Sequence, residues 1–383
     1  MKKLAFNFFL AGMTLAVMLV STEGMIRLFA PQLTYRFPRD LFAADASTSY
    51  RLRSGYEGVL DTPEYRTSIR VTSQGLRDDR EYLEKTDGEL RILMLGDSFV
   101  MGVGVDLEET VVEQLEDTLD ERFLERDVEI INMGVPGYST RQALATLETY
   151  GDDLDADLVI LGFFVGNDFS ENAGEPLRVD DGYLVDGTRH EGLIPYPVRR
   201  FIKLHSQFYH FLWPIQRRLR GHGGAEAGES ARRIAEIFLI DEEVARPITQ
   251  PSLEALEDLV RACEERGLPL AVMIIPDHAQ VVDGPWDALI DQTGAPRSVY
   301  DRAAPSRRIA KFLEARGVPT LDLLPGFRAR EDRDALYLPL DKHWTAIGHD
   351  VATVAATRFI GAIIDGNTQL ARAAGTKPVR RAD

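Results

Sequence analysis

Ser98 is a serine that could act as a nucleophile. It ends the sequence Gly96-Asp97-Ser98, which follows an apolar run at 92–95 and precedes an amphipathic stretch at 107–125. This pattern predicts a strand, a tight turn and a helix. The serine would then stand at the carboxyl end of a strand, where open α/β sheets bind their ligands. Attack of a serine hydroxyl on a carbonyl also needs a base, a group that orients the base, and donors for the oxyanion.

His343 is the histidine best placed to be the base. It follows the last predicted strand and precedes the final predicted helix, so it belongs to the same edge of the sheet. Asp341, two residues earlier, can reach the Nδ1–H of His343 from the same loop, although it could also form a simple ion pair or begin the helix. His278 is the rival base or a substrate contact, and His349 falls inside the final helix and is expected to be structural. The other histidines lie in an insertion without a carboxylate that would orient them: His190, His205, His210 and His222.

Two further strand ends supply hydrogen-bond donors. Gly134 and Gly137 follow the second predicted strand, and a glycine lets a backbone N–H approach a substrate closely. Asn167 follows the third predicted strand, although an asparagine there could simply cap a turn. The convergence of these residues with Ser98 and His343 on one edge favours a functional interpretation.

Composition narrows the class of partner. The formal net charge of −17 argues against a nucleic-acid partner. Because Cys263 is the only cysteine, no intramolecular disulfide can form, and its apolar helical context indicates a buried, inert thiol. The third glycine of a dinucleotide fingerprint is missing after Gly102-Val103-Gly104, and the Gly-x-Ser-x-Gly elbow is absent. We expect no metal and no cofactor.

Apolar runs alternate with helical stretches from residue 91 onwards. This alternation is typical of βαβ units, which form a parallel sheet with helices on both faces. We predict an α/β fold, a three-layer α/β/α sandwich with a five-stranded parallel sheet in flavodoxin-like order. The expected strands lie at 92–95, 128–132, 158–164, 270–275 and 320–323, and the expected helices at 107–125, 139–153, 252–266, 301–316 and 345–364.

The amino terminus predicts export. Lys2 and Lys3 precede the almost wholly apolar residues 4–20, a length at the lower limit for a membrane span. A small-residue cleavage pair is missing after this run, which favours an uncleaved signal anchor over a cleaved secretory signal. The basic residues would stay inside. The protein would be a single-pass cell-membrane protein with an extracytoplasmic catalytic domain, or secreted if the segment is cleaved.

Four segments divide the chain. Residues 1–29 form the predicted membrane helix and juxtamembrane segment, and residues 30–90 a β-rich extension with one or two short strands beside the main sheet. Residues 91–370 form the α/β domain with an insertion at 169–250, and residues 371–383 a flexible tail. Within the insertion, residues 198–220 are basic and aromatic. We favour a helical lid that packs its aromatic residues on the domain, with a membrane-surface helix or an anionic-glycan site as the alternatives.

The candidate residues together are similar to a known family. They resemble, in the same order, the four sequence blocks of the SGNH (GDSL-type) hydrolase superfamily: Gly96-Asp97-Ser98, Gly137, Gly166-Asn167-Asp168 and Asp341-x-His343.

The resemblance implies a role for each matching residue. Ser98 would be the nucleophile and His343 the general base, oriented by Asp341. The backbone N–H groups of Ser98 and Gly137 and the side-chain amide of Asn167 would form the oxyanion hole. Gly137 is preferred over the earlier glycine because it matches the second glycine of the family block.

Two blocks depart from the family pattern. Val165 stands where the first glycine of Gly-x-Asn-Asp would be, and a single residue separates Asp341 from His343 where the family has two. The Asp-x-His-Trp form, completed by Trp344, is similar to that of alginate O-acetyltransferase-like proteins of the same superfamily, which are exported and modify polysaccharide. Hydrolase and transferase therefore both stay open.

The preferred hypothesis is an exported serine esterase that cleaves small acyl esters, in particular O-acetyl groups on a carbohydrate, through an acyl-Ser98 intermediate. Its partners would be that acylated carbohydrate or small ester and the membrane. An O-acetyltransferase of a surface polysaccharide would use the same residues. The third alternative is a catalytically silent glycan-binding assembly protein.

Overall fold

The computed structural model describes residues 2–32, 34, 37–82, 84–86, 88–123, 127–174, 177–185, 195–212 and 231–366. Several sequence predictions therefore lie outside the described residues. They are the flexible tail at 371–383, the second half of the basic segment, and His190 and His222.

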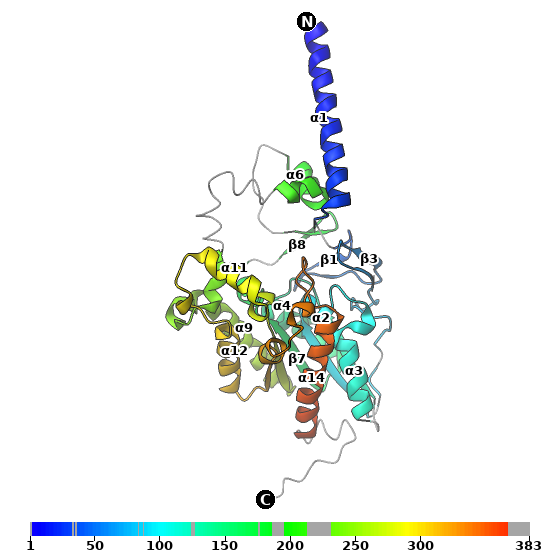
Figure 1. Cartoon of the computed structure of the whole chain (residues 1–383). Coiled ribbons are helices and arrows are strands. Elements are labelled where there is room, and N and C mark those ends of the chain that lie inside the picture. Colours follow the sequence, from blue (N-terminus) through cyan, green and yellow to red (C-terminus); the bar gives the residue numbers. More distant parts are fainter. Residues whose placement is uncertain are drawn as a thin grey trace, which may run out of the picture.

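A five-stranded parallel sheet forms the centre of the molecule (Figure 1). Its strand order is β11-β10-β7-β5-β6, which is the flavodoxin-like order, so the predicted sheet is confirmed. Leu93 in the central strand pairs with Ile131 on one side and Val159 on the other. The strands are β5 (Leu90–Gly96), β6 (Val128–Gly134), β7 (Leu158–Phe164), β10 (Leu270–Ile275) and β11 (Thr320–Asp322).

Both faces of the sheet are covered by helices, which explains why its strands are continuous apolar runs. Side chains alternate between the two faces along a strand. Ile92 and Met94 join the core beneath α3 and α14, whereas Leu93 and Leu95 join the core beneath α4, α9 and α12. Cys263 of α9 is buried in the second core, where burial raises the pKa of its thiol to about 12.

The covering helices match the predicted ones in number and order, with shifted ends. The predicted helix at 107–125 is broken at Thr110, whose side chain caps α3 by accepting the Glu113 N–H at 3.3 Å. The helix predicted from residue 252 begins at Glu242, because Asp241 caps it there and two internal prolines are tolerated. The helices are α3 (Val111–Arg122), α4 (Thr140–Thr146), α9 (Glu242–Arg266), α12 (Ala304–Glu314) and α14 (Ala346–Gly366).

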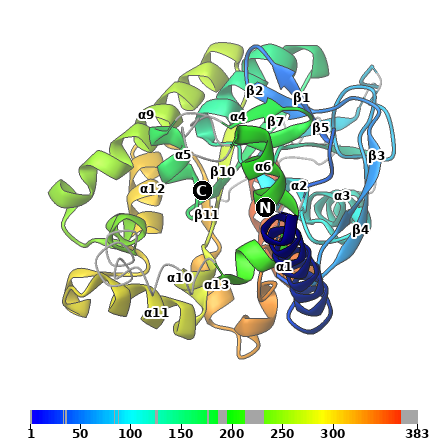
Figure 2. The same cartoon turned by 90° about the horizontal axis from the view of Figure 1, so that it is seen from above.

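The extension forms more strands than predicted and packs elsewhere. It contains two antiparallel hairpins, β1 (Phe42–Asp45) with β2 (Ser49–Leu52) and β3 (Glu57–Asp61) with β4 (Arg66–Arg70). Their buried side chains form a core with residues that follow β5 and β6, such as Met101 and Val135. The extension therefore covers the carboxyl edge of the sheet rather than its side (Figure 2).

The amino-terminal helix α1 (Lys2–Phe29) stands clear of the rest of the molecule (Figure 1). Its stretch Phe6–Phe29 is long and apolar enough to cross a membrane, and only 6% of the window is buried. Helix α14 passes the same test of length and composition, but 44% of its window is buried and it is a core helix of the sandwich.

Shorter elements occupy the connections. They are α2 (Ser98–Met101), α5 (Asp168–Ala173), β8 (Arg178–Asp180), β9 (Tyr183–Val185), α6 (Tyr196–His205), α10 (His278–Val281), α11 (Asp283–Thr293) and α13 (Leu324–Arg328), with single turns at Leu107–Glu109, Leu147–Gly151, Asp152–Leu154, Glu236–Phe238, Arg297–Val299 and Arg333–Leu336.

Candidate active site

Ser98 is the first residue of α2, directly after the central strand β5. Asp97 caps this helix by accepting the Phe99 N–H at 2.9 Å. The turn ends at Gly102, whose φ of 83° is a conformation that glycine adopts readily. Ser98 is 8% exposed, so its hydroxyl lies in a largely dehydrated place at the edge of the sheet.

Three predicted residues come together through two short hydrogen bonds. Ser98 Oγ lies 2.7 Å from His343 Nε2, and His343 Nδ1 lies 2.6 Å from Asp341 Oδ1. Because the carboxylate can only accept, His343 carries a proton on Nδ1 and accepts the Ser98 hydroxyl proton at Nε2. The Phe99 ring lies 4.9 Å from the imidazole, centroid to centroid, and helps to fix its plane.

The short Asp-x-His spacing is accommodated by the residue between them. Lys342 has a φ of 70°, a left-handed conformation that turns the chain back within one residue. The loop is closed by Leu338, whose N–H donates to His343 O at 2.8 Å and whose carbonyl accepts the Lys342 N–H at 3.0 Å. This turn lets Asp341 and His343 point toward each other with one residue fewer than the family pattern has.

The β3–β4 connection of the extension holds the Asp341 loop from the other side. Tyr65 donates its hydroxyl proton to Asp341 Oδ2 at 2.7 Å. The Glu64 carboxylate accepts the N–H of Leu340 at 2.6 Å and that of Asp341 at 2.7 Å. The sequence analysis missed both residues. Apart from an alternating strand pattern at residues 65–71, no local signal could have connected them to a loop 276 positions away.

Gly137 presents a backbone N–H at the same edge, after β6. Among the described residues this N–H has no hydrogen-bond acceptor, whereas the Gly134 N–H donates to Asn132 Oδ1 at 3.0 Å. The difference favours Gly137 over Gly134 as a donor to substrate. The φ of Gly137 is 78°, and a Cβ there would come within 2.9 Å of the Tyr50 hydroxyl, so a side chain is disfavoured on two counts.

Asn167 caps α5, and its side chain meets the Asp97 carboxyl. Asn167 Oδ1 and Asp97 Oδ2 are both buried, and neither has a hydrogen-bond partner in the part of the chain that the structure describes. Burial and the nearby charge of Asp168 raise the pKa of Asp97 well above its usual range, which favours its protonated form. A proton on Asp97 can be donated to Asn167 Oδ1, and this leaves the amide N–H groups of Asn167 to face a substrate oxygen.

Asp168 ties two of the strand-end loops together. Its Oδ1 accepts the N–H and hydroxyl of Thr140 at 2.7 and 2.8 Å, and its Oδ2 accepts the Phe164 N–H at 2.8 Å. Complete burial raises the pKa of Asp168 to about 7, although these three hydrogen bonds oppose the shift. The loop with Gly137 is therefore fixed relative to the end of β7.

The structure separates the remaining histidines from Ser98. His349 is buried and accepts the Val111 N–H at 3.0 Å through Nδ1, so it caps α3, and burial lowers its pKa to about 3. His278 begins α10 and faces the Tyr337 ring at 5.2 Å; burial and then the charge of Lys342 lower its pKa to about 4. Among the described insertion residues, His205 and His210 lie in or near α6.

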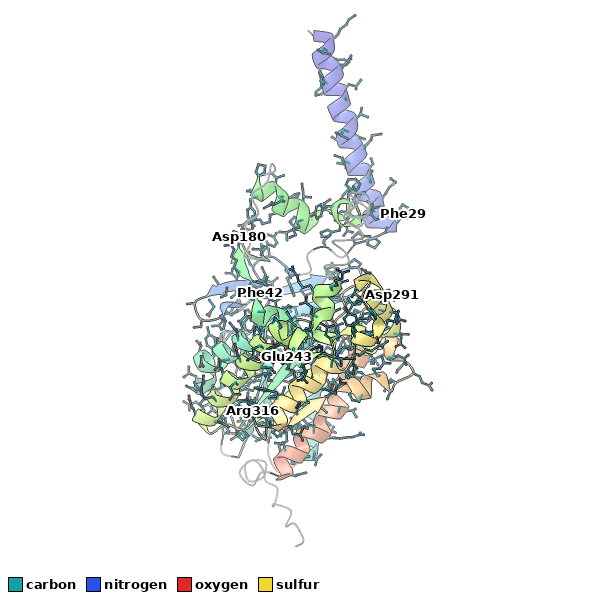
Figure 3. All side chains as sticks on the ribbon, turned by 90° about the vertical axis from the view of Figure 1, so that its left-hand side faces the viewer. Phe29, Phe42, Asp180, Glu243, Asp291 and Arg316 are labelled. Carbon is teal, nitrogen blue, oxygen red and sulfur yellow. The ribbon has the colours of Figure 1, made fainter. Side chains whose placement is uncertain are left out.

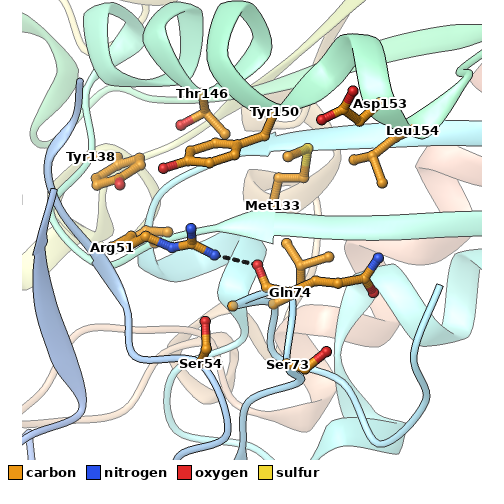
Figure 4. A pocket seen from close by; sticks show the side chains of 13 residues that line it. Arg51, Ser54, Ser73, Gln74, Met133, Tyr138, Thr146, Tyr150, Asp153 and Leu154 are labelled. Atoms are coloured by element: carbon orange, nitrogen blue, oxygen red, sulfur yellow. Dashed lines mark hydrogen bonds between the residues drawn. The ribbon is translucent and has the colours of Figure 1, made fainter. Parts of the chain in front are cut away.

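A pocket of about 290 Å³ lies between the extension and α4 (Figure 4). It is lined by Arg51, Gln74, Met133, Tyr138 and Tyr150 among others, and by none of the candidate active-site residues. Within the described ranges, histidine, cysteine and carboxylate side chains form no group of three that could hold a metal ion.

Sequence comparison places most of the α/β domain in one family. The family model described as the GDSL-like lipase/acylhydrolase family matches residues 94–351. The match includes Ser98, Asn167 and His343 and leaves out the extension with Glu64 and Tyr65. A comparison with curated proteins gave no match.

Structure comparison finds distant matches. A lipolytic protein of the G-D-S-L family from Desulfitobacterium hafniense DCB-2 is 10% identical, with a TM-score of 0.36, over 70% of this chain and 98% of that one. A psychrotrophic esterase from Pseudoalteromonas sp. is 14% identical, with a TM-score of 0.38, over 72% and 98%. A two-domain esterase active on acetylated mannans is 13% identical, with a TM-score of 0.39, over 77% and 52%.

Proposed function

The chain belongs to the GDSL-like lipase/acylhydrolase family and is an ester-cleaving hydrolase, and we propose that it is an exported, membrane-anchored serine esterase that removes small acyl groups, in particular O-acetyl groups, from a carbohydrate. The observation that carries the proposal is the 2.7 Å contact between Ser98 Oγ and His343 Nε2. This contact supports Ser98 as the nucleophile and His343 as its base.

The first half of the reaction forms the acyl-enzyme. His343 Nε2 takes the hydroxyl proton while Ser98 Oγ bonds to the ester carbonyl carbon. The backbone N–H groups of Ser98 and Gly137 and the amide of Asn167 donate to the resulting oxyanion. The carbon–oxygen bond to the sugar then breaks, and His343 gives its proton to the departing hydroxyl.

The second half releases the acyl group as a carboxylic acid. His343 removes a proton from water, which attacks the acyl carbon, and the proton returns to Ser98 Oγ as the ester to Ser98 breaks. Asp341 holds the imidazole in the required tautomer and stabilises its positive charge during both halves. Its 2.6 Å distance to His343 Nδ1 and the turn at Lys342 support this role.

Two features support an exported enzyme acting on carbohydrate esters. The exposed apolar helix α1 has the length of a membrane span and follows two lysines, which favours an extracytoplasmic domain. The Asp341-x-His343-Trp344 block is similar to that of alginate O-acetyltransferase-like proteins, which modify polysaccharide.

The proposal is tested with the full chain in detergent, using p-nitrophenyl acetate and an acetylated oligosaccharide. We expect acetate release from both by the wild-type protein and none above background by Ser98→Ala, whereas Ser54→Ala, which changes an exposed serine, should retain full activity. Turnover by Ser98→Ala at the wild-type rate contradicts the assignment.

The transferase alternative is separated by the same assay. The short Asp-x-His-Trp block favours it as the second candidate, and both reactions would share the acyl-enzyme at Ser98. Release of free acetate without a sugar acceptor argues against obligatory transfer, because water then completes the reaction. A burst of one equivalent of p-nitrophenol without turnover, followed by turnover when a sugar is added, would favour the transferase.

A further inference from the structure

The end of α6 is attached to the last turns of α1 by one carboxylate. Glu23 accepts the N–H groups of Gln207 and Phe208, each at 2.9 Å, and the hydroxyl of Ser206 at 3.0 Å. Arg27 pairs with Glu23 at 2.8 Å and so completes the set. Helix α6 and the helical turn at 207–212 are therefore fixed at the height where the exposed apolar part of α1 ends (Figure 1).

An apolar groove of about 740 Å³ runs between these two parts of the chain. Phe201 is 65% exposed and Val198 is 50% exposed, so α6 does not pack its aromatic face on the α/β domain as a lid would. This is a correction to the favoured sequence interpretation, for the described half of the segment. The groove is lined by Leu19, Val20, Phe201, Ile202, Phe208 and Leu212 among others.

The segment at 196–212 is locally basic in an acidic protein. It contains no acidic residue, and it carries two arginines and the exposed Lys203. A helix with aromatic and apolar residues on one side and basic residues on the other is typical of a helix that lies at a bilayer surface, where its basic groups meet anionic headgroups.

Contacts also link α6 to the catalytic edge. Arg200 pairs with Asp180 of β8 at 2.9 Å. Leu177, just before β8, lies against Gly137, since a Cβ at that glycine would be 3.1 Å from Leu177 Cδ1. In Figure 3, Asp180 lies between the base of α1, marked by Phe29, and the α/β body. The carboxyl edge of the sheet thus faces the side from which α1 projects.

We propose that α6 and residues 207–212 lie in the headgroup layer of the bilayer that α1 spans, with a lipid acyl chain in the apolar groove, and that the ester substrate is carried at this bilayer surface. The inference rests on the proposed function, because α1 must stay as the anchor. It adds a substrate class: an acylated amphiphile or lipid-linked saccharide rather than a freely diffusing glycan. The docked helix holds the catalytic edge toward the surface on which such a substrate is presented.

The position of α6 is tested in vesicles of phosphatidylethanolamine and phosphatidylglycerol that contain the full chain. A nitroxide label on Phe201→Cys should be more accessible to oxygen than to a water-soluble nickel complex. The matched control is Val354→Cys, on a 53% exposed side chain of α14, where the order should be reversed. Unmutated protein controls for labelling of buried Cys263. Equal accessibility to the nickel complex at both positions overturns the proposal.

Substrate presentation is tested with acetylated dodecyl maltoside held in the same vesicles and with soluble p-nitrophenyl acetate. We expect Phe201→Asp to lower the rate on the vesicle-held ester by about tenfold, because a buried interfacial side chain becomes charged, and to leave the soluble rate unchanged. An unchanged ratio of the two rates overturns this part of the proposal, as does cleavage of p-nitrophenyl acetate alone by the wild type. Absence of all hydrolysis with a lipid-buried label contradicts the esterase instead.

Discussion

Tyr65 donates a hydrogen bond to Asp341 Oδ2 at 2.7 Å, on the opposite carboxylate oxygen from the one that meets His343. Tyr65 lies outside the region matched by the family, residues 94–351. The extension therefore contributes to the geometry of the candidate active site, together with Glu64, which accepts two N–H groups of the same loop.

Tyr65→Phe should lower kcat by about tenfold and leave KM nearly unchanged. The ring is kept, so the fold should hold, but Asp341 loses the bond that fixes its outer oxygen, and about 1.4 kcal/mol of orientation corresponds to a tenfold loss of rate. Steady-state kinetics with p-nitrophenyl acetate measure the effect. Tyr56→Phe, in the same extension, is the control and should be fully active; equal kcat for the two variants contradicts the role of Tyr65.

Asn167→Ala should reduce kcat by about 10²–10³ because one of three proposed oxyanion donors is lost. The thermal midpoint should stay close to that of the wild type, since Asn167 Oδ1 has no partner among the described residues. Near-normal turnover would show that this amide does not meet the substrate. Ser170→Ala, on the exposed side of the same helix, is the matched control.

Asp97 and Asp168 should respond in opposite ways to replacement by asparagine. Asp168 accepts hydrogen bonds from three donors, and an amide cannot accept all of them, so Asp168→Asn should destabilise the protein by about 1–3 kcal/mol. Asp97 accepts from Phe99, and its other oxygen is free to carry a proton. Asp97→Asn keeps one acceptor and one donor and should retain folding and most of the activity. Urea unfolding and kinetics of both variants test the contrast; equal damage contradicts it.

His349→Asn should flatten the acid dependence of stability. The pKa of His349 is about 3 in the folded protein against 6.5 in the unfolded chain. Between these values the unfolded chain binds more protons, so stability is unaffected above pH 6.5 and falls as the pH drops below it, on the order of 2 kcal/mol by pH 4. Asparagine can still accept the Val111 N–H but does not titrate. Urea midpoints at pH 7 and pH 4.5 should differ less for the variant; identical differences contradict the assignment.

The sequence predicted the sheet well because its signal is local. Runs such as Ile92 to Leu95, buried on both faces, alternate with amphipathic helices, and this pattern allows few topologies. The end of α9 at Glu242 was missed because Pro247 and Pro251 indicate a helix boundary, whereas Asp241 provides the cap that begins the helix earlier.

The candidate active site was predicted in part for a similar reason. Ser98, Asp341 and His343 stand in short motifs at strand ends, and the structure brings them within hydrogen-bond distance. Glu64 and Tyr65 stand in no motif, and their contacts arise only when the extension folds over the carboxyl edge. The pairing of Asp97 with Asn167 likewise depends on burial, which spacing along the chain does not reveal.

The 245-residue separation between Ser98 and His343 has a consequence for biosynthesis. Ser98 leaves the ribosome long before its base, and the sheet that supports both is complete only after β11. A nascent chain caught between synthesis and translocation thus carries a serine without a general base. Its ester-cleaving power switches on only after nearly all of the polypeptide has emerged and folded, which spares the esters of the compartment in which the chain is made.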